Sequence, residues 1–390
     1  MTSKNTFKIL VKTAFGLENV LAKELKDLGL QEIEVLKRAV YCVGNTEDLY
    51  KINYLSRTAL RVYKFIKEVD VFNEDGLYGE ISKIQWDSLF EVNQCFAIDS
   101  IVNSTRFTHS KYVALKAKDA IVDQFRSKYN KRPSIDTYDP DLRILIHIRD
   151  TTCGVFLDSS GYSLHKRGYR IMNTEAPISE CLAAGMLLLA GWSSEKKVFY
   201  DPMCGSGTFL IEASMIALNI PAGKFRSYYA FEKWNDYDEK LFYQVKSEAL
   251  SKVCKPSAEL KIIGNDKSRR VLQSAKENIR KAALLDLIEL NAKPFEKLKN
   301  NDPEGLMVTN PPYDKRIVDE DIEGLYKAFG DLLKNEFCGW SAWIISSNFA
   351  ALKKVGLSTS RKLVLYNGAD ECKFQRYDMY TGSKKKKKNT

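Results

Sequence analysis

A glycine-rich turn between an apolar strand and an apolar helix is the feature that most restricts how this chain can fold. Residues 197–200 are predicted to form the strand, and residues 209–219 carry apolar side chains at helical spacing. The turn itself is residues 201–208, in which Gly205 and Gly207 let the backbone bend tightly and approach a ligand closely. The N-terminus of the helix that follows presents unpaired N–H groups and partial positive charge, which favour a bound carboxylate. The pattern predicts an α/β fold with a ligand-binding loop.

The turn differs from two common phosphate-binding loops. It is not followed by Gly-Lys-Ser/Thr, as in a P-loop, and Leu210 stands where the dinucleotide fingerprint has its third glycine. It instead resembles motif I of methyltransferases that use S-adenosylmethionine (SAM), in which the glycine loop wraps the methionine part of the cofactor. The resemblance implies cofactor contacts from Asp201, Pro202, Cys204, Gly205, Ser206, Gly207 and Thr208. Among these, Cys204 is expected to pack beside the cofactor and not to act as a nucleophile.

A second apolar strand ends in an acidic residue. Residues 260–264 form this predicted strand, and Asn265 and Asp266 follow it. A carboxylate at the end of the second strand is well placed to accept hydrogen bonds from both ribose hydroxyls of a cofactor. Asp266 is therefore the predicted ribose ligand. The alternative is that Asp266 or Ser268 caps the helix predicted over residues 269–283.

A third apolar strand, residues 306–309, leads into Asn-Pro-Pro-Tyr. Ligands in open α/β sheets bind beyond the carboxyl ends of the strands. Because two prolines remove two N–H donors and fix φ, the Asn310 amide oxygen and the Pro311 carbonyl could each accept one N–H of an amine. Tyr313 adds a π-face on which a planar base can stack. Asn310, Pro311, Pro312 and Tyr313 are the predicted catalytic residues; the alternative is a plain strand end with a proline turn.

The glycine loop, the acidic strand end and the Asn-Pro-Pro-Tyr tetrapeptide occur in the order that a SAM methyltransferase sheet requires. The order predicts an enzyme that moves the SAM methyl group onto an exocyclic amine of a nucleobase by in-line displacement. No dedicated general base is evident in the sequence.

Length and charge restrict the organisation and the partners. A chain of 390 residues exceeds one comfortable core, so two or three domains are expected. The formal net charge is +10, of which the lysine run at residues 384–388 supplies 5. Such a charge is compatible with a polyanionic partner, although charge alone is a weak argument. The lysine run is expected to be a disordered tail.

The cysteines and histidines favour neither a metal site nor a disulfide framework. The eight cysteines include no Cys-x-x-Cys pair, and His109, His147 and His165 are scattered along the chain. Free thiols in a reducing cytoplasm fit this pattern, and no metal is expected. No run approaches the ~18 apolar residues of a membrane span, so no membrane partner is expected.

The region between residues 46 and 158 alternates predicted helices and strands and interleaves cations with aromatic residues. The cations are Arg106, His109, Lys111, Lys116, Lys118, Arg126, Lys128, Lys131 and Arg132, and the aromatic residues are Phe107, Tyr112 and Tyr129. This combination suits phosphate contacts together with base stacking. The alternative is a solvated helix face on which the lysine stems cover apolar surface.

Nearly the whole chain resembles the THUMP-domain RNA methyltransferases. Gly16-Leu17-Glu18 before a leucine-rich helix, residues 164–170, the glycine loop, the Asn-Pro-Pro-Tyr tetrapeptide, and residues 338–340 and 367–372 carry the resemblance. The match is closest to the large-subunit ribosomal RNA guanine-N2 methyltransferases, as a stand-alone form of the N-terminal half of a bifunctional enzyme. It implies a cytoplasmic, SAM-dependent enzyme that methylates the N2 amine of a guanosine, first of all in 23S rRNA.

The fold class implied is α/β, with a Rossmann-like SAM methyltransferase sheet preceded by an α+β ferredoxin-like/THUMP RNA-binding module. The implied boundaries are 1–43 for the ferredoxin-like subdomain, 44–162 for the THUMP domain, 163–381 for the methyltransferase domain and 382–390 for the lysine-rich tail. At the position where this family usually has an acidic residue against the adenine of SAM, the chain has Pro294, with Glu296 two residues on. The mode of adenine recognition therefore stays open.

The sequence leaves three other functions as alternatives. A tRNA guanine-N2 methyltransferase of related architecture is the nearest alternative. A DNA adenine-N6 methyltransferase would use the same tetrapeptide in the same way, but this function would not account for residues 1–160. A non-catalytic RNA-binding or ribosome-assembly factor is the alternative from a different class, and the intact motifs speak against it.

Overall fold

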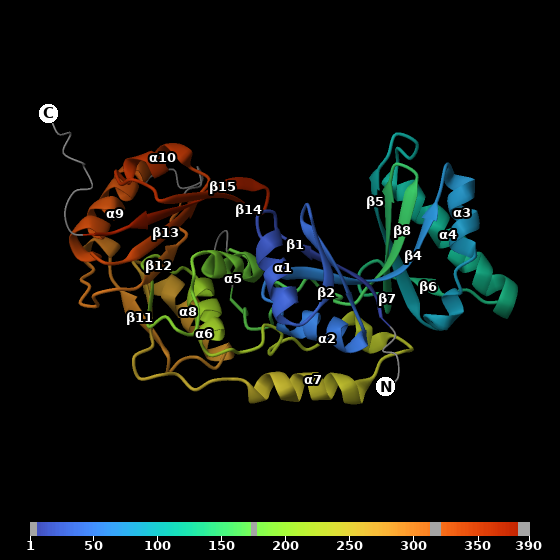
Figure 1. Ribbon diagram of the computed structural model, residues 1–390, viewed down its shortest axis with the longest axis horizontal. Helices are drawn as coiled ribbons and strands as arrows, with labels where there is room; N and C mark the ends of the chain where they lie inside the picture. The colour runs from blue at the N-terminus through green and yellow to red at the C-terminus, as the bar shows by residue number, and fades with distance from the viewer. Residues whose placement is uncertain (1–5, 173–177, 313–320, 381–390) are drawn as a thin grey trace. The chain divides into compact units, whose positions relative to one another are not determined.

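Two β-sheets, each the centre of its own unit, organise the computed structural model of this chain (Figure 1). The structure describes residues 6–172, 178–312 and 321–380. Unit 1 comprises Met1–Thr13, Leu21–Leu164 and Arg226–Glu248, and unit 2 comprises Ala14–Val20, His165–Phe225 and Ala249–Thr390. Both units are therefore assembled from segments that are discontinuous in the sequence.

Unit 1 is built on an 8-stranded sheet with the order β2-β3-β1-β4-β8-β7-β5-β6. The strands are β1 Phe7–Thr13, β2 Gln31–Leu36, β3 Ala39–Gly44, β4 Ala59–Asp70, β5 Cys95–Asn103, β6 Ser134–Ile135, β7 Leu142–Arg149 and β8 Thr152–Asp158. Neighbours are antiparallel from β2 to β7, whereas β5 runs parallel to β7 and β6. The helices are α1 Glu18–Asp27, α2 Thr46–Leu55, α3 Glu74–Ser82, α4 Ser110–Tyr129 and α7 Glu239–Ser251, with short 3-10 turns η1 Trp86–Ser88 and η2 Ala230–Lys233.

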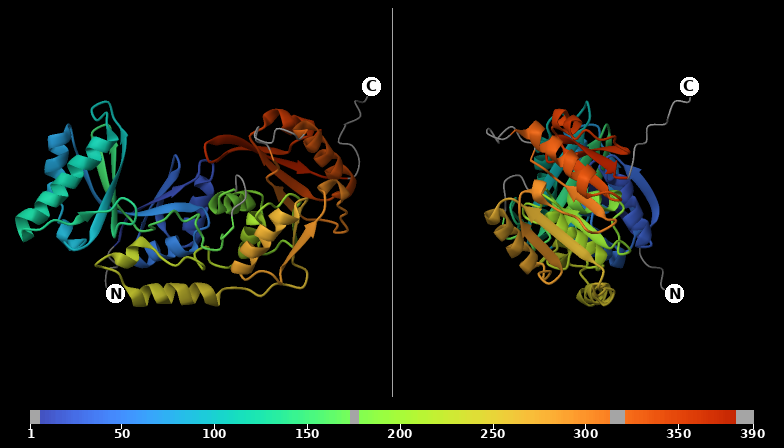
Figure 2. Two further views of the ribbon diagram at one scale, coloured as in Figure 1. Left: turned by 180° about the vertical axis from the view of Figure 1, so that it is seen from behind. Right: turned by 90° about the vertical axis from the view of Figure 1, so that its left-hand side faces the viewer.

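The two faces of the sheet in unit 1 differ. In β7, Ile144, Ile146 and Ile148 are fully buried, while His147 is half-buried and Arg149 is exposed. This two-residue period is typical of a strand that is covered on one face only. Helices α3 and α4 contact each other, and α4 packs on β5 at the covered face (Figures 1 and 2).

Unit 2 is built on a 7-stranded sheet with the order β11-β10-β9-β12-β13-β15-β14. The strands are β9 Val198–Asp201, β10 Lys261–Asp266, β11 Ile288–Ala292, β12 Leu306–Thr309, β13 Ser341–Ser346, β14 Arg361–Asn367 and β15 Asp370–Asp378. The strands from β11 to β13 are parallel, and β15 is antiparallel to both β13 and β14. The helices are α5 Glu180–Leu189, α6 Thr208–Ala217, α8 Arg269–Lys281, α9 Ile322–Glu336 and α10 Phe349–Lys354, with η3 Phe295–Lys297.

The central strands of unit 2 are buried on both faces. In β12, Leu306 and Val308 join the apolar core that includes α5, α6 and α8, whereas Met307 joins the core that includes α9 and α10. Such strands have near-continuous apolar sequences, which is the pattern that predicted them. Among the described residues, no helix is long and apolar enough to cross a membrane.

The short segment Ala14–Val20 belongs to unit 2 although the strands on either side of it belong to unit 1. Leu17 is fully buried, and a Cβ added to Gly185 of α5 would lie 2.4 Å from the Leu17 Cδ1 atom. Gly16 has φ +84°, and a Cβ there would lie 2.8 Å from the Val364 carbonyl oxygen in β14. The Gly-Leu pair therefore fits the core of unit 2, because only glycine allows this backbone conformation and this close approach.

The contact between α9 and α10 yields a stability prediction. Glycine to alanine normally stabilises a helix interior by about 0.5–1 kcal/mol. A Cβ at Gly330 of α9, however, would lie 1.8 Å from the Val355 carbonyl oxygen. We expect Gly330→Ala to lower the free energy of unfolding by about 1–3 kcal/mol, the usual cost of overpacking, as measured by urea titration followed by circular dichroism.

The matched control is Gly79→Ala in α3, where a Cβ would meet no described heavy atom within 4 Å. This variant should be as stable as the parent or slightly more stable. Equal stability of the two variants would contradict the packing assigned to α9.

Candidate active site

The predicted cofactor loop and the predicted catalytic tetrapeptide follow two neighbouring strands. Strand β9 has β10 on one side and β12 on the other, so the chain order reverses at β9. In β9 and β12, Phe199 is paired with Leu306, and Tyr200 with Met307. Ligands of open α/β sheets bind at such a switch point, beyond the carboxyl ends of the strands. Asp201 and Asn310 therefore lie at the same edge of the sheet, one at the end of each strand.

A buried carboxylate ties the two motifs together. Asp201 is 1% exposed, and its Oδ1 atom accepts a 2.8 Å hydrogen bond from the Thr309 hydroxyl. The same oxygen accepts a 3.2 Å hydrogen bond from the Met203 N–H. Asp201 thus contacts both the start of the glycine loop and the residue that precedes Asn310. Sequence reasoning predicted Asp201 as a cofactor contact but gave Thr309 no role.

The surroundings of Asp201 favour its neutral form. Burial raises the pKa of this carboxyl group from its ordinary 3.8 to about 7; the hydrogen bonds from Thr309 and Met203 oppose the shift, and the nearby Asp266 adds to it. A buried carboxyl group without a cation beside it disfavours its charged state in this way. The stability of unit 2 should therefore depend on pH through Asp201.

The glycine loop adopts the conformation that its residues predict. Gly205 has φ +53° and Gly207 has φ +82°, values that other residues rarely adopt. A Cβ at Gly205 would meet no described heavy atom within 4 Å, so the space beside this residue is open. Gly207 precedes the first turn of α6, and no side chain caps that end. The loop therefore presents the open space and the free N–H groups that a carboxylate-bearing ligand requires.

The basic segment before α5, residues 165–170, is packed inside unit 2. Arg167 is 1% exposed and forms an ion pair with Glu212 of α6 at 3.6 Å. The Tyr169 hydroxyl donates a 2.9 Å hydrogen bond to the same carboxylate. The segment is thereby fixed to the helix that follows the glycine loop.

Arg170 holds the glycine loop itself. Its Nε donates to Glu180 at 2.7 Å, its Nη1 to the Ser206 hydroxyl at 3.1 Å and its Nη2 to the Thr208 hydroxyl at 2.8 Å. The planar guanidinium supplies several donors in fixed directions, which suits a fork of this kind. Ser206 and Thr208, both predicted cofactor contacts, use their hydroxyls to shape the loop. The sequence revealed a basic segment here but not which of its cations would reach the loop.

Asp266 lies where a ribose ligand is expected. Its Oδ2 accepts a 3.2 Å hydrogen bond from the Gly205 N–H, and its Oδ1 accepts a 2.9 Å bond from the Ser268 N–H. The carboxylate keeps lone pairs for two further donors. The N-cap of α8 is Ser268, whose hydroxyl accepts from the Val271 N–H. The alternative role of Asp266 as the helix cap therefore falls to Ser268.

Two asparagines connect the loops at this edge. Asn265 is fully buried, and its Nδ2 donates to the carbonyls of Pro202 at 3.0 Å and Lys293 at 2.9 Å. Asn278 of α8 donates to the Ser206 carbonyl at 3.2 Å. Through these hydrogen bonds Asn265 and Asn278 fix the backbone of the glycine loop, whose residues are predicted to contact the cofactor. The spacing of residues in the sequence predicts neither asparagine's role. Beyond Lys293, Pro294 and Glu296 are exposed.

The position of Cys204 is that of a packing residue. Its N–H donates a 2.8 Å hydrogen bond to the Asn265 carbonyl, and its side chain is buried. Burial raises the pKa of the thiol well above its ordinary range, so the group stays protonated. A cysteine in this state is a poor nucleophile, in line with the expectation from the sequence.

The tetrapeptide presents an acceptor that lacks a donor. The Asn310 Oδ1 atom is buried and has no hydrogen-bond partner among the described residues. Pro311 is buried and Pro312 half-buried. A buried amide oxygen without a donor costs about 1–3 kcal/mol, which a ligand N–H can offset. Tyr313, the predicted stacking residue, lies outside the described residues.

Metal chemistry has no evident site in this geometry. Within residues 6–172, 178–312 and 321–380, no group of three or more histidine, cysteine, aspartate or glutamate side chains could hold a metal ion. The described polar groups at the edge of the sheet are instead hydrogen-bond donors and acceptors. They suit an organic ligand with a carboxylate and hydroxyls.

Three family models match the chain. They are described as the RMKL-like methyltransferase domain, over residues 167–376, the RlmL ferredoxin-like domain, over residues 8–63, and the THUMP domain, over residues 72–158. Together they cover both units and include the glycine loop and Asn310.

Curated relatives and solved structures agree with these matches. A protein of Synechocystis sp. named as an RNA methyltransferase is 38% identical over 379 residues, which are 97% of this chain and 98% of that protein. The ribosomal RNA large subunit methyltransferase K/L of Marinomonas sp. is 33% identical, over 98% of this chain and 54% of its own length. The chain thus spans about half of that relative.

Among solved structures, a protein from Clostridium difficile 630 described as a methylase has a TM-score of 0.88 and 30% identity, over 97% of this chain and 100% of that one. The crystal structure of SMU.472, described as a methyltransferase complexed with SAH, has a TM-score of 0.86 and 30% identity, over 98% of this chain and 100% of that one.

The raised pKa of Asp201 yields a prediction on stability and pH. Because the folded pKa of about 7 exceeds the ordinary 3.8, the stability that the protonated group contributes is complete below about pH 3.8 and is lost as the pH rises to about 7. Asp201→Asn keeps an acceptor oxygen and cannot ionise. We expect the free energy of unfolding of this variant, relative to the parent, to rise by about 1.4 kcal/mol per pH unit up to pH 7 and then to level off.

Urea titrations between pH 5.5 and 8.5 measure this difference, and ionisations common to both proteins cancel in it. A difference that does not change with pH would contradict the assigned environment of Asp201.

Proposed function

The chain belongs to the RMKL-like methyltransferase family, and from that premise we propose that it methylates the N2 amine of a guanosine in large-subunit ribosomal RNA. SAM is the methyl donor of the family, and the solved relative SMU.472 carries SAH, the product of methyl transfer. The K/L relatives are named for ribosomal RNA of the large subunit. The observation that carries the proposal is the buried Asn310 Oδ1, which has no hydrogen-bond partner among the residues that the structure describes and follows the strand next to the glycine loop.

The residues at the sheet edge fit SAM. The free N–H groups at the start of α6 suit the carboxylate of its methionine part, and Asp266 can accept hydrogen bonds from both ribose hydroxyls. Open space beside Gly205 leaves room for the cofactor against the loop backbone. Arg170, through Ser206 and Thr208, keeps the loop in this conformation. When bound, SAM supplies an electrophilic methyl group on a sulfonium centre.

The tetrapeptide fits the amine. Guanine N2 is a poor nucleophile because its lone pair is delocalised into the ring. Acceptors at the Asn310 Oδ1 and the Pro311 carbonyl would take both N–H bonds of the amine and direct the lone pair toward the methyl group. The same two oxygens stabilise the positive charge that grows on nitrogen during transfer. Holding the two reactants in line supplies much of the remaining acceleration.

The substrate must be presented as an extruded base. In paired RNA the N2 amine is engaged in the helix, so an enzyme that acts on it has to take the guanine out of the stack. The proline pair favours this because it leaves a stiff surface with carbonyl acceptors and without N–H donors. Since ribosomal RNA is made in the cytoplasm, we expect the enzyme to work there.

Replacement of Asn310 tests the catalytic role. We expect Asn310→Ala to lower kcat about 10²–10³-fold, the usual loss when one charge-stabilising group is removed, while the Kd for SAM changes less than about twofold. Methyl transfer measured with tritiated SAM gives kcat, and calorimetry gives the Kd. Equal losses in kcat and in SAM affinity would show that Asn310 supports the fold and not the reaction.

The substrate class is tested by offering four acceptors in parallel: undermodified large-subunit rRNA, tRNA, DNA and no nucleic acid. We expect tritium to enter the rRNA, and nuclease digestion with mass spectrometry to find N2-methylguanosine. Incorporation into tRNA would favour the related tRNA enzyme, and incorporation into DNA as N6-methyladenine would favour a DNA methylase. No incorporation, with intact RNA binding, would favour a ribosome-assembly factor.

A further inference from the structure

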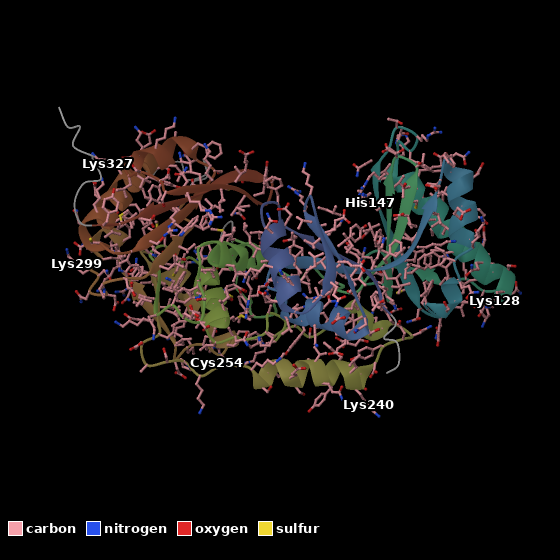
Figure 3. The ribbon with its side chains drawn as sticks, viewed as in Figure 1. Lys128, His147, Lys240, Cys254, Lys299 and Lys327 are labelled. Atoms are coloured by element: carbon pink, nitrogen blue, oxygen red, sulfur yellow. The ribbon has the colours of Figure 1, made fainter. Side chains whose placement is uncertain are left out.

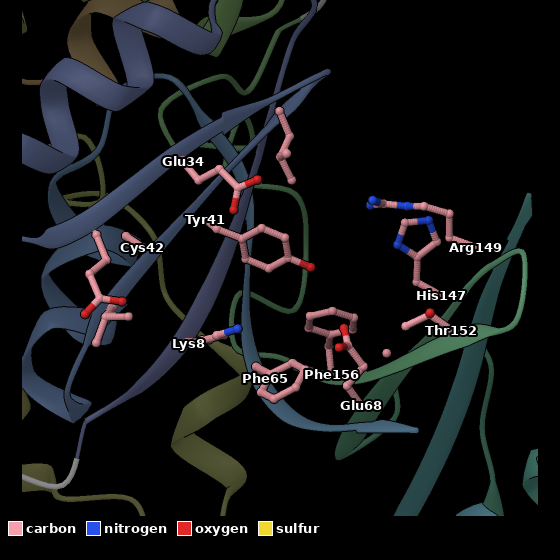
Figure 4. Close-up of a pocket in the computed structure, with 14 residues that line it drawn as sticks. Lys8, Glu34, Tyr41, Cys42, Phe65, Glu68, His147, Arg149, Thr152 and Phe156 are labelled. Atoms are coloured by element: carbon pink, nitrogen blue, oxygen red, sulfur yellow. The ribbon is translucent and has the colours of Figure 1, made fainter. Parts of the chain in front are cut away.

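Unit 1 contains a hollow on the face of its sheet opposite helices α3 and α4. Residues paired across antiparallel strands share a face, and the pairs Leu10–Tyr41, Leu10–Tyr63 and Leu145–Phe156 place an apolar cluster on this one. The hollow measures about 440 Å³ and lies within unit 1 (Figure 4). Its size is in the range of small-molecule sites.

A register shift in β4, of the kind that a β-bulge causes, lies at the hollow. Strand β4 is 12 residues long, and its register with β8 shifts between Phe65 and Lys67. A bulge bends the strand and increases its twist. The sheet is therefore concave here, with side chains of β1, β2 and β3 on one side and those of β7 and β8 on the other, as Figure 4 shows for Tyr41 and His147.

The floor of the hollow is aromatic. The Phe65 and Phe156 rings meet edge to face, with centroids 5.5 Å apart, and Tyr63 packs on Phe156 at 6.5 Å. Phe65 and Tyr41 are half-buried, so part of each ring faces the hollow. A Cβ at Gly154 would lie 2.7 Å from the Phe156 ring, so glycine is what leaves space for that ring. A partly accessible aromatic floor of this kind suits a planar partner.

Charges of both signs surround the floor without forming ion pairs. The cations are Lys8 and Arg149, and the carboxylates are Glu32, Glu34 and Glu68. All five side chains are exposed, and none forms a salt bridge with a described residue. Burial, with Lys12 and Arg149 nearby, lowers the pKa of His147, which is therefore neutral at physiological pH. The hollow thus offers separate sites for an anion and for hydrogen-bond donors.

The basic face of α4, which the sequence predicted as an RNA contact, differs in this respect. Lys116 pairs with Asp75, Lys118 with Asp119, Arg126 with Asp123 and Lys128 with Asp87. The aromatic Phe107 of the same predicted cluster is buried. Cations that already have carboxylate partners gain less from a phosphate than free ones. Four of the nine predicted cations are paired in this way, while Tyr112 and Tyr129 are exposed. The cluster around α4 therefore suits non-specific phosphate contacts, whereas the hollow combines charges of both signs with aromatic rings.

We propose that this hollow binds one unpaired nucleotide of the RNA substrate, with the base on the aromatic floor, the phosphate at Arg149, and the base N–H groups at the carboxylates of Glu34 and Glu68. The proposal rests on the proposed function, since it takes the substrate to be RNA. Lys8 and Arg149 would repel a cationic peptide, and the three glutamates would repel an acidic peptide. An apolar segment would bury all five charges without partners, which is costly. A nucleotide satisfies both sets of groups.

The carboxylates imply a preference among bases. A carboxylate only accepts hydrogen bonds, so it favours bases with an exocyclic amine, which are guanine, adenine and cytosine. Uracil offers a single N–H and no amine. The nucleotide must be unpaired, because only an unstacked base can lie flat on an aromatic side chain.

The test uses the full chain and fluorescein-labelled RNA hexamers with guanosine, adenosine or cytidine at one position of a uridine background, together with hexauridine. Fluorescence anisotropy gives the Kd. We expect the three amine-bearing hexamers to bind more tightly than hexauridine. Tyr41→Ala should weaken their binding at least about fivefold, the lower end of the loss of one stacked base. Arg149→Ala should weaken all hexamers, and a Glu34→Gln, Glu68→Gln double variant should remove the preference for amine-bearing bases.

Matched controls come from α7 in the same unit. Tyr243 is 68% exposed and Lys240 is exposed (Figure 3), so Tyr243→Ala and Lys240→Ala remove a tyrosine and a cation away from the hollow. Both should bind RNA like the parent. Circular dichroism establishes that each variant is folded, and Tyr41→Phe keeps the ring if Tyr41→Ala does not fold.

Three outcomes would overturn the proposal. The first is that Tyr41→Ala and Arg149→Ala bind RNA with the same Kd as the parent. This result would be decisive if a Lys116→Ala, Lys128→Ala double variant of α4 no longer binds RNA. The second is equal affinity of the parent for all four hexamers. The third is binding of an oligoarginine peptide to the parent in the absence of RNA that is tighter than binding of the hexamers and is lost in the Glu34→Gln, Glu68→Gln double variant, which would assign the hollow to a protein partner.

Methyl transfer measured on the same variants separates this proposal from the proposed function. If the parent methylates rRNA and the variants keep its KM for rRNA, the hollow proposal fails alone. If the parent methylates no RNA but hexamer binding depends on Tyr41 and Glu34, the proposed function fails and the hollow keeps its assignment.

Discussion

The hydrogen bond between Thr309 and Asp201 is the contact on which the geometry of the active-site edge depends. It joins the ends of β9 and β12, the two strands at which the order of the sheet reverses. Every other group at this edge is placed relative to one of these two ends. The glycine loop begins at Asp201, and Asn310 directly follows Thr309. A shift of one strand against the other would separate the glycine loop from Asn310, which we propose to hold the cofactor and the amine, and displacements of about 1 Å already cost large factors in rate.

The predictable parts of the fold are those in which the backbone conformation or the burial at one place requires a particular type of residue. The strand, glycine loop and helix were predictable because Gly205 and Gly207 have positive φ and because β9 and β12 are buried on both faces. Helices α3, α7, α9 and α10 escaped prediction. Helix α9 shows why, since its packing on α10 relies on the missing side chain of Gly330, a residue that by itself lowers helix propensity.

The supporting residues of the active site could not be predicted, because their partners are remote in sequence. Arg170 is 36 residues from Ser206, and Asn278 is 72 residues from it. No spacing rule connects such positions. On the basic face of α4 the sequence shows the cations, but it does not show that carboxylates from other elements, such as Asp75 and Asp87, pair with some of them. The sequence shows how many cations a region contains, but it does not show how many of them lack a carboxylate partner in the fold and could bind a phosphate.

A nucleotide site in unit 1 would also help to meet the cost of presenting a weak nucleophile to the methyl donor. Taking a guanine out of paired RNA costs a few kcal/mol, and the two acceptors at Asn310 and Pro311 act only after that cost has been met. Binding energy from a part of the substrate that does not react can offset such a cost. One stacked base contributes about 1–3 kcal/mol, and a phosphate contact at Arg149 would add to it. The energy of the hollow is then of the same size as the energy needed to present the base, so recognition in one unit can support chemistry in the other.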